Sequence, residues 1–168
     1  MLTIRQNLLH VTITMALLSG MIAVAEAQHR HGRGMMDPGH AADMQVFHSL
    51  FEHRADITRH VTKLSNGVDT LTESDNSEVA SLLQAHVDAM VARVKDGRGI
   101  HLRDPLFREL FRYADRITAT VERTPKGVHV VETSTDRHVV TLLQAHADVV
   151  SAFLANGHAE MMKDHAVP

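Results

Sequence analysis

The sequence predicts an α+β fold in which two αββα units form a four-stranded antiparallel sheet with helices packed on one face. Residues 47–97 align without gaps with residues 107–157, and 18 of the 51 aligned positions are identical. Each copy also contains a tight-turn signal between β-branched residues, followed by an apolar stripe at helical spacing. Because two copies are too few for a solenoid, we expect two halves related by a pseudo-twofold axis within a single domain, residues 45–168, that also includes a C-terminal tail.

The first element of each copy is expected to be a helix. Its apolar residues fit one helical face: Phe47, Leu50, Phe51, Ile57 and Val61. The second copy repeats all five residue types and is preceded by Asp104-Pro105, a typical helix start.

A hairpin and a second helix follow in each copy. The turns are expected at Ser65-Asn66-Gly67 and Pro125-Lys126-Gly127. The residues 75–77 and 135–136 offer N-caps for the second helices, and Gly97 and Gly157 are expected to end them.

The N-terminal part indicates export. An apolar stretch from Leu8 to Val24 precedes Ala25-Glu26-Ala27, which predicts a cleaved signal peptide over residues 1–27 and a periplasmic protein with no membrane segment after cleavage. Residues 28–44 are expected to form a flexible arm rich in His and Met. The net charge of −3 disfavours nonspecific nucleic-acid binding, and the absence of cysteine excludes disulfides and thiolate metal sites.

His86 and His146 are the leading candidate metal ligands. They occupy equivalent positions on the apolar stripes of the two second helices, so a twofold axis could bring them together. Two neutral imidazoles could then bind one transition metal or supply two axial ligands to a haem. In the alternative, each imidazole donates a hydrogen bond and only completes the helix packing.

The C-terminal segment supplies a second candidate set. If residues 158–165 are helical, four side chains share one face and suit copper(I): His158, Met161, Met162 and His165. In the alternative, both methionines pack on the sheet and both histidines are solvated. No catalytic motif is present, so we expect no enzymatic activity.

Several segments resemble a family of uncharacterised exported bacterial proteins with a duplicated half-domain, some of them fused to or encoded with c-type cytochromes. The resemblance covers nearly all of the chain after residue 44, and the segments that carry it include Asn66-Gly67-Val68, Leu82 to His86, Asp104 to Phe107, Leu142 to His146 and His165 to Pro168. It implies an exported protein in redox surroundings. Haem attachment does not carry over, because this chain has no Cys-x-x-Cys-His site.

These observations lead to one functional hypothesis and one alternative. The hypothesis is a non-enzymatic metal- or haem-binding accessory protein of the periplasm, with copper or haem as the bound group. The alternative is a structural or protein-interaction module of a periplasmic redox system that binds no ion and contacts an exported cytochrome.

Overall fold

The computed structural model describes residues 37–168. These residues form an α+β domain with the elements, in chain order, α2 (Pro38–Glu52), η1 (Arg54–Asp56), β1 (Ile57–Leu64), β2 (Gly67–Ser74), α3 (Ser77–Asp96), α4 (Pro105–Arg112), η2 (Ala114–Arg116), β3 (Thr118–Thr124), β4 (Gly127–Thr133), α5 (Arg137–Asn156) and α6 (His158–Met161). The predicted fold class is confirmed. The predicted signal peptide and residues 28–36 of the predicted arm lie outside the described residues.

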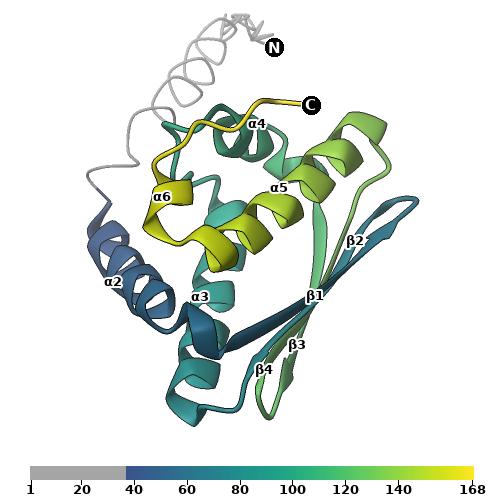
Figure 1. The fold of residues 1–168 in the computed structure, drawn as a ribbon. Helices are drawn as coiled ribbons and strands as arrows, with labels where there is room; N and C mark the ends of the chain where they lie inside the picture. The colour runs from purple at the N-terminus through teal and green to yellow at the C-terminus, as the bar shows by residue number, and fades with distance from the viewer. Residues whose placement is uncertain (1–36) are drawn as a thin grey trace, which may run out of the picture. The chain divides into compact units, whose positions relative to one another are not determined.

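The four strands form one antiparallel sheet in the order β1-β2-β4-β3 (Figure 1). The two hairpins are therefore joined through their second strands. In that central pair, Gly67 lies opposite Thr133 and Glu73 lies opposite Gly127. Thr70 and Val130, which are equivalent in the two aligned segments, lie opposite each other at its middle.

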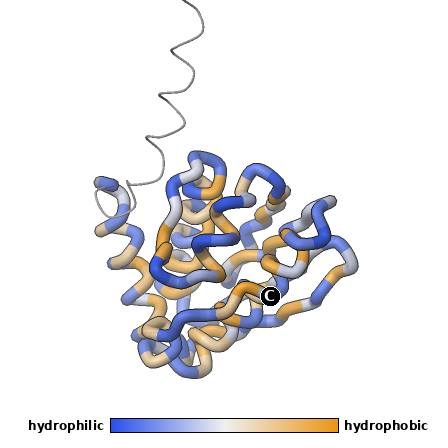
Figure 2. The backbone as a smooth tube through the Cα atoms, turned by 90° about the horizontal axis from the view of Figure 1, so that it is seen from above, coloured by the Kyte–Doolittle hydropathy of each residue, from blue (hydrophilic) through white to orange (hydrophobic). Residues whose placement is uncertain are grey.

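The helices cover one face of the sheet (Figure 1). On β2 the alternate residues that point toward them are buried: Val68, Thr70, Thr72 and Ser74. Hydrophobic and hydrophilic residues alternate along the helices (Figure 2), as expected for elements with one buried face. Within residues 37–168, α5 is the one helix long and apolar enough to cross a membrane by length and composition, and here it packs on the sheet and on α4.

Each long helix is attached by one glutamine to the hairpin of the other aligned segment. Nε2 of Gln84, on α3, donates to the carbonyl oxygens of Thr124 and Gly127 at 3.0 and 3.2 Å. Nε2 of Gln144, on α5, donates to those of Leu64 and Gly67 at 2.8 and 3.1 Å. The two sets of contacts differ by a shift of 60 residues, which agrees with the two-copy interpretation. The duplication itself stays a prediction.

Ion pairs also join each long helix to a strand of the other aligned segment, again with a shift of 60 residues between the two pairs. Nζ of Lys63, on β1, lies 2.6 Å from Oδ2 of Asp148, on α5. Arg123, on β3, pairs with Asp88, on α3. Both aspartates therefore lie at helix–strand contacts, although all four side chains remain largely solvent-exposed, so these pairs add little stability.

A buried arginine attaches α2 to α3. Arg93 has no exposed surface, and its guanidinium lies 2.5 Å from Oδ2 of Asp43 and 2.9 Å from Oδ2 of Asp37. Asp37 also caps α2 by accepting from the Gly39 amide at 3.0 Å. The hydrogen bond from Gly39, together with the neighbouring Arg98 and Arg93, lowers the pKa of Asp37, so the network keeps its charges at neutral pH.

Most predicted boundaries agree with the structure. The hairpin turns lie at residues 65–66 and 125–126, and Asn76, Asp104 and Asp136 accept hydrogen bonds as N-caps. Gly97 and Gly157 follow the two long helices with φ of 62° and 63°. At these two positions a side chain would strain the backbone.

Two predicted boundaries are wrong. The first helix ends at Glu52, so Ile57 and Val61 lie on β1 and not on a helical face. Likewise, Ile117 is the C-cap of η2 and Val121 lies on β3. The flexible arm was expected to extend to Met44, but α2 begins at Pro38, because the Asp37 cap and the Arg93 ion pairs hold its first turns.

We expect Arg93→Ala to lower the free energy of unfolding by about 3–5 kcal/mol, because it leaves the partly buried Asp43 without a counter-charge and leaves Asp37 with Arg98 alone. The measurement is urea denaturation followed by circular dichroism. Arg98→Ala is the matched control, since Arg98 is more exposed and should cost less than about 1 kcal/mol. Equal losses for the two variants would contradict the assigned role of Arg93.

Candidate functional site

His86 and His146 line the same cavity. The cavity has a volume of about 260 Å³ and lies between the helices and the covered face of the sheet. Its wall is mostly aliphatic and aromatic, with contributions from α2, α3, α4, α5 and all four strands. The sequence placed the two histidines on equivalent apolar stripes, and the structure brings them to one space.

Each imidazole packs against an equivalent phenylalanine. The ring centroids of His86 and Phe47 are 5.6 Å apart, and those of His146 and Phe107 are 5.2 Å apart. Phe153 lies next to both phenylalanines, with ring centroids at 6.2 and 6.0 Å. The aromatic cluster therefore holds both imidazoles at the helix side of the cavity.

Burial keeps both imidazoles neutral. It lowers the pKa of His86 to about 4, although the nearby charge of Asp43 acts in the opposite direction. It also lowers the pKa of His146 to about 4, with help from the charges of Arg59 and His86. At pH 7 each ring thus retains a lone pair. Nδ1 of His86 is buried and has no hydrogen-bond partner among residues 37–168.

The sheet supplies four further polar groups, which we call the cavity floor: Arg59, Thr70, Thr72 and Glu132. Nη1 of Arg59 donates to Oγ1 of Thr72 at 2.6 Å, and the buried Nε of Arg59 has no partner in the described part of the chain. Burial lowers the pKa of Arg59 and raises that of Glu132. A charged group and a second titratable group thus face an apolar space, a pattern typical of binding and active sites.

The cavity floor differs between the two aligned segments, whereas the histidines do not. The position equivalent to Arg59 is Ala119, and the position equivalent to Thr72 is Glu132. All four residues line the cavity. The helix side of the cavity therefore presents two imidazoles at equivalent positions, whereas the two halves of the sheet present different side chains.

Sequence analysis did not single out Arg59 or Glu132. Arg59 lies between Ile57 and Val61, which the sequence assigned to a helix. In the strand β1 these three residues share the inward face. A charged residue among inward-facing apolar positions is the signal that a correct strand assignment would have given.

The C-terminal candidate set is not brought together. Helix α6 ends at Met161, so the one-face arrangement expected over residues 158–165 does not form. Met161 is buried at 8% exposure and Met162 is 57% exposed. His158 is exposed, and both ring nitrogens of His165 have carboxylate partners.

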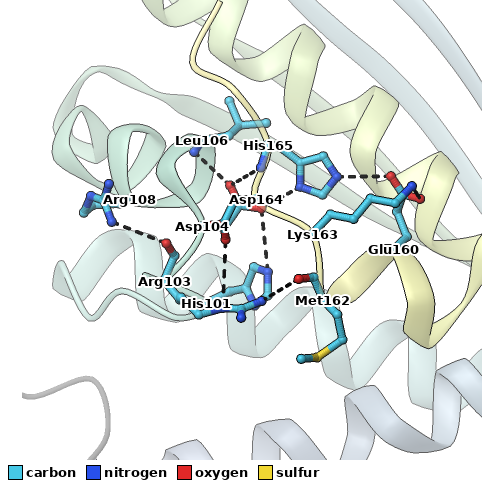
Figure 3. Close-up of polar contacts among 10 residues, drawn as sticks. All are labelled: His101, Arg103, Asp104, Leu106, Arg108, Glu160, Met162, Lys163, Asp164 and His165. Carbon is cyan, nitrogen blue, oxygen red and sulfur yellow. Dashed lines mark hydrogen bonds and ion pairs between the residues drawn. The ribbon is translucent and has the colours of Figure 1, made fainter.

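His165 instead fastens the C-terminal segment to the start of α4 (Figure 3). Its Nδ1 lies 2.6 Å from Oδ2 of the fully buried Asp104, and its Nε2 lies 3.2 Å from Oε1 of Glu160. Although burial acts to lower it, these hydrogen bonds raise the pKa of His165. Hydrogen bonds from Lys163, His165 and Asn156 lower the pKa of Glu160 to about 2.

His101 connects this network to the cavity. It lines the cavity, and its Nε2 lies 3.8 Å from Oδ2 of Asp104 (Figure 3). Its φ of 56° is in the left-handed region, and its ring packs edge-on against Phe107 with centroids 4.9 Å apart. The residues 97–104, which join α3 to α4, thus pass between the C-terminal segment and the cavity.

No group of three or more His, Cys, Asp or Glu side chains suited to holding a metal ion occurs among residues 37–168. The two imidazoles of the cavity therefore have no third side-chain ligand of these types. Comparisons with protein-family models, with curated proteins and with solved structures found no match.

The buried histidines predict a pH-dependent stability. Their folded-state pKa values of about 4 lie below the ordinary value of 6.5, so the unfolded chain binds up to about two more protons between these pH values. Stability should therefore fall as the pH drops from 7 to 4, by up to about 1.4 kcal/mol per pH unit for each histidine. The measurement is urea denaturation at pH 7, 6 and 5. His86→Gln/His146→Gln should flatten this dependence, whereas the exposed pair His48→Gln/His158→Gln should not.

His165→Ala should lower the free energy of unfolding by about 1–3 kcal/mol, because it leaves the buried carboxylate of Asp104 without its histidine partner. Since the pKa of His165 is raised, this loss should be largest below pH 6.5 and should shrink as the pH rises through that pKa. Thermal denaturation at pH 6 and pH 9 measures both effects. A loss of the same size in His158→Ala would contradict the contact.

Proposed function

We propose that this chain is a non-enzymatic binding protein, exported to the periplasm, whose ligand occupies the cavity and contacts His86 and His146. The observation that carries the proposal is that two equivalent imidazoles, both kept neutral by burial, line one apolar cavity. A structural histidine needs a hydrogen-bond partner, yet Nδ1 of His86 has none within the described residues.

The size of the cavity favours a bound ligand over a packing defect. Protein interiors are normally close-packed, with few voids larger than a water molecule. A space of about 260 Å³ is well above that size, so a ligand that fills it would gain contacts with the apolar wall.

The volume also bears on the kind of ligand. An apolar cavity of about 150 Å³ accommodates benzene, and pockets for drug-sized molecules measure about 300–1,000 Å³. A cavity of 260 Å³ therefore suits a molecule with one ring or a short chain. Neutral imidazoles supply its polar contacts.

A haem or a metal ion is the second candidate ligand. Neutral imidazole is the form that binds transition metals, and this favours the metal- or haem-binding hypothesis. A lone ion would find only two imidazoles here, because the described residues contain no larger cluster. A haem brings four nitrogen ligands of its own, but its macrocycle would require the helices to move away from the sheet.

The rival is a structural module that binds no ligand and contacts a cytochrome through its surface. The packing of both imidazoles against Phe47 and Phe107 favours it, since these contacts are typical of a core. The two functions differ in what happens when the cavity is filled by a side chain. A side chain that fills the cavity should stabilise a structural module without changing its function, whereas it should weaken ligand binding by a binding protein.

The test is isothermal titration of the purified protein with 1-octanol, haem, Zn²⁺ and Cu⁺, with Val130→Phe as the cavity-filling variant. Val130 lines the cavity, and its neighbour Val131 points to the opposite face of the sheet, so Val131→Phe is the matched control. We expect one equivalent of 1-octanol to bind wild type and Val131→Phe, and about tenfold weaker binding to Val130→Phe. Tight haem binding that His86→Gln/His146→Gln abolishes would select the second candidate. Failure of every probe to bind would overturn the proposed function.

A further inference from the structure

The cavity floor contains an arginine that forms no ion pair within the described residues. Arg59 lies on the inward face of β1, and no carboxylate oxygen within residues 37–168 lies within 4.0 Å of its guanidinium nitrogens. Buried charges are normally paired, because an unpaired one pays its desolvation cost without return. Arginine cannot avoid this cost by losing its proton.

Neither of the two acidic residues of the cavity forms an ion pair with Arg59. Asp43 lines the cavity, but its carboxylate is paired with Arg93 at 2.5 Å. Glu132 lies opposite Val68 and Arg59 lies opposite Thr72, so the two side chains start four residues apart along β2. Their charges act on each other, since Arg59 lowers the pKa of Glu132 and Glu132 raises that of Arg59. Burial has the larger effect on Glu132 and raises its pKa, which favours the uncharged form.

The hydrogen bonding of Arg59 leaves two of its guanidinium nitrogens without a partner among the described residues. Nη1 donates to Thr72, whereas Nε is buried without a partner and Nη2 makes no hydrogen bond within the described part. Thr72 thus fixes the guanidinium in place. Nε has no exposed surface, whereas Nη2 is not buried and can donate a hydrogen bond to a carboxylate.

His146 lines the same cavity as Arg59, and the charge of Arg59 helps to lower the pKa of His146. A negative group bound to Arg59 would therefore also be near a neutral imidazole that can donate a hydrogen bond. The rest of the lining is predominantly apolar, including Phe47, Val128 and Phe153. The cavity thus combines one anion-binding position with an apolar space.

We propose that the ligand is a small amphipathic acid, with one ring or a short chain as its apolar body and a carboxylate that binds the guanidinium of Arg59 through Nη2. This inference rests on the proposed function and specifies the ligand of the same cavity. It assigns to Arg59 the role of distinguishing an acid from a neutral molecule of the same size.

The experiment uses two matched pairs of probes: octanoate with 1-octanol, and benzoate with benzyl alcohol. Isothermal titration at pH 7 measures the affinity of each for wild type, Arg59→Gln and Arg123→Gln. Arg123 also points to the covered face of the sheet, but it is solvent-exposed and paired with Asp88, so it is the control. We expect wild type and Arg123→Gln to prefer the acid of a pair about tenfold or more, and Arg59→Gln to lose this preference while still binding the alcohol.

Three results would overturn the inference, and they separate it from the proposed function. Equal binding of acid and alcohol to wild type, or an acid preference that survives in Arg59→Gln, overturns the inference alone. Absence of binding for all four probes overturns both. Thermal denaturation verifies that Arg59→Gln is folded, and we expect it to be at least as stable as wild type because it removes an unpaired buried charge. As a second readout, octanoate should raise the pKa of His146 in wild type, measured by NMR, because the carboxylate offsets the charge of Arg59.

Discussion

The antiparallel pairing of β2 with β4 determines where every group around the cavity lies. It joins the two hairpins into one sheet and sets Thr70 opposite Val130 at the middle. The long helices begin directly after these two strands, and Gln84 and Gln144 attach each helix to the other hairpin. Two histidines that are 60 residues apart in the chain therefore reach one space. A shift of one residue in this register would turn either Thr70 and Thr72 on β2 or Glu132 on β4 to the open face.

The parts of the fold that sequence predicts well are those fixed by local chemistry. Side chains that accept from nearby backbone amides mark helix starts, as at Asp104 and Asp136, and glycine marks their ends, as at Gly97. The segment from Phe47 to Val61 was predicted less well, because its apolar residues fit a helix at the beginning and a strand at the end. Tertiary packing decides between the two: Ile57 and Val61 share the inward face of β1.

The site shows the same division between local and long-range information. His86 and His146 could be selected because each interrupts an apolar helical stripe, a property that sequence displays directly. The contact between His165 and Asp104 could not be predicted in this way, because the two residues are 61 positions apart and Asp104 caps a different helix. Arg59 was hidden for a further reason, since a charged residue is conspicuous only once the inward positions of its strand are known.

The unequal cavity floor has a consequence for how any ligand sits. Two identical half-domains would present the same groups on both sides, and a bound molecule could turn end for end at no cost. Here Arg59 and Thr72 are matched by Ala119 and Glu132, so head and tail meet different surroundings and one orientation is favoured. The two imidazoles, although equivalent along the chain, thus have different charged neighbours, Asp43 for His86 and Arg59 for His146, and are not interchangeable.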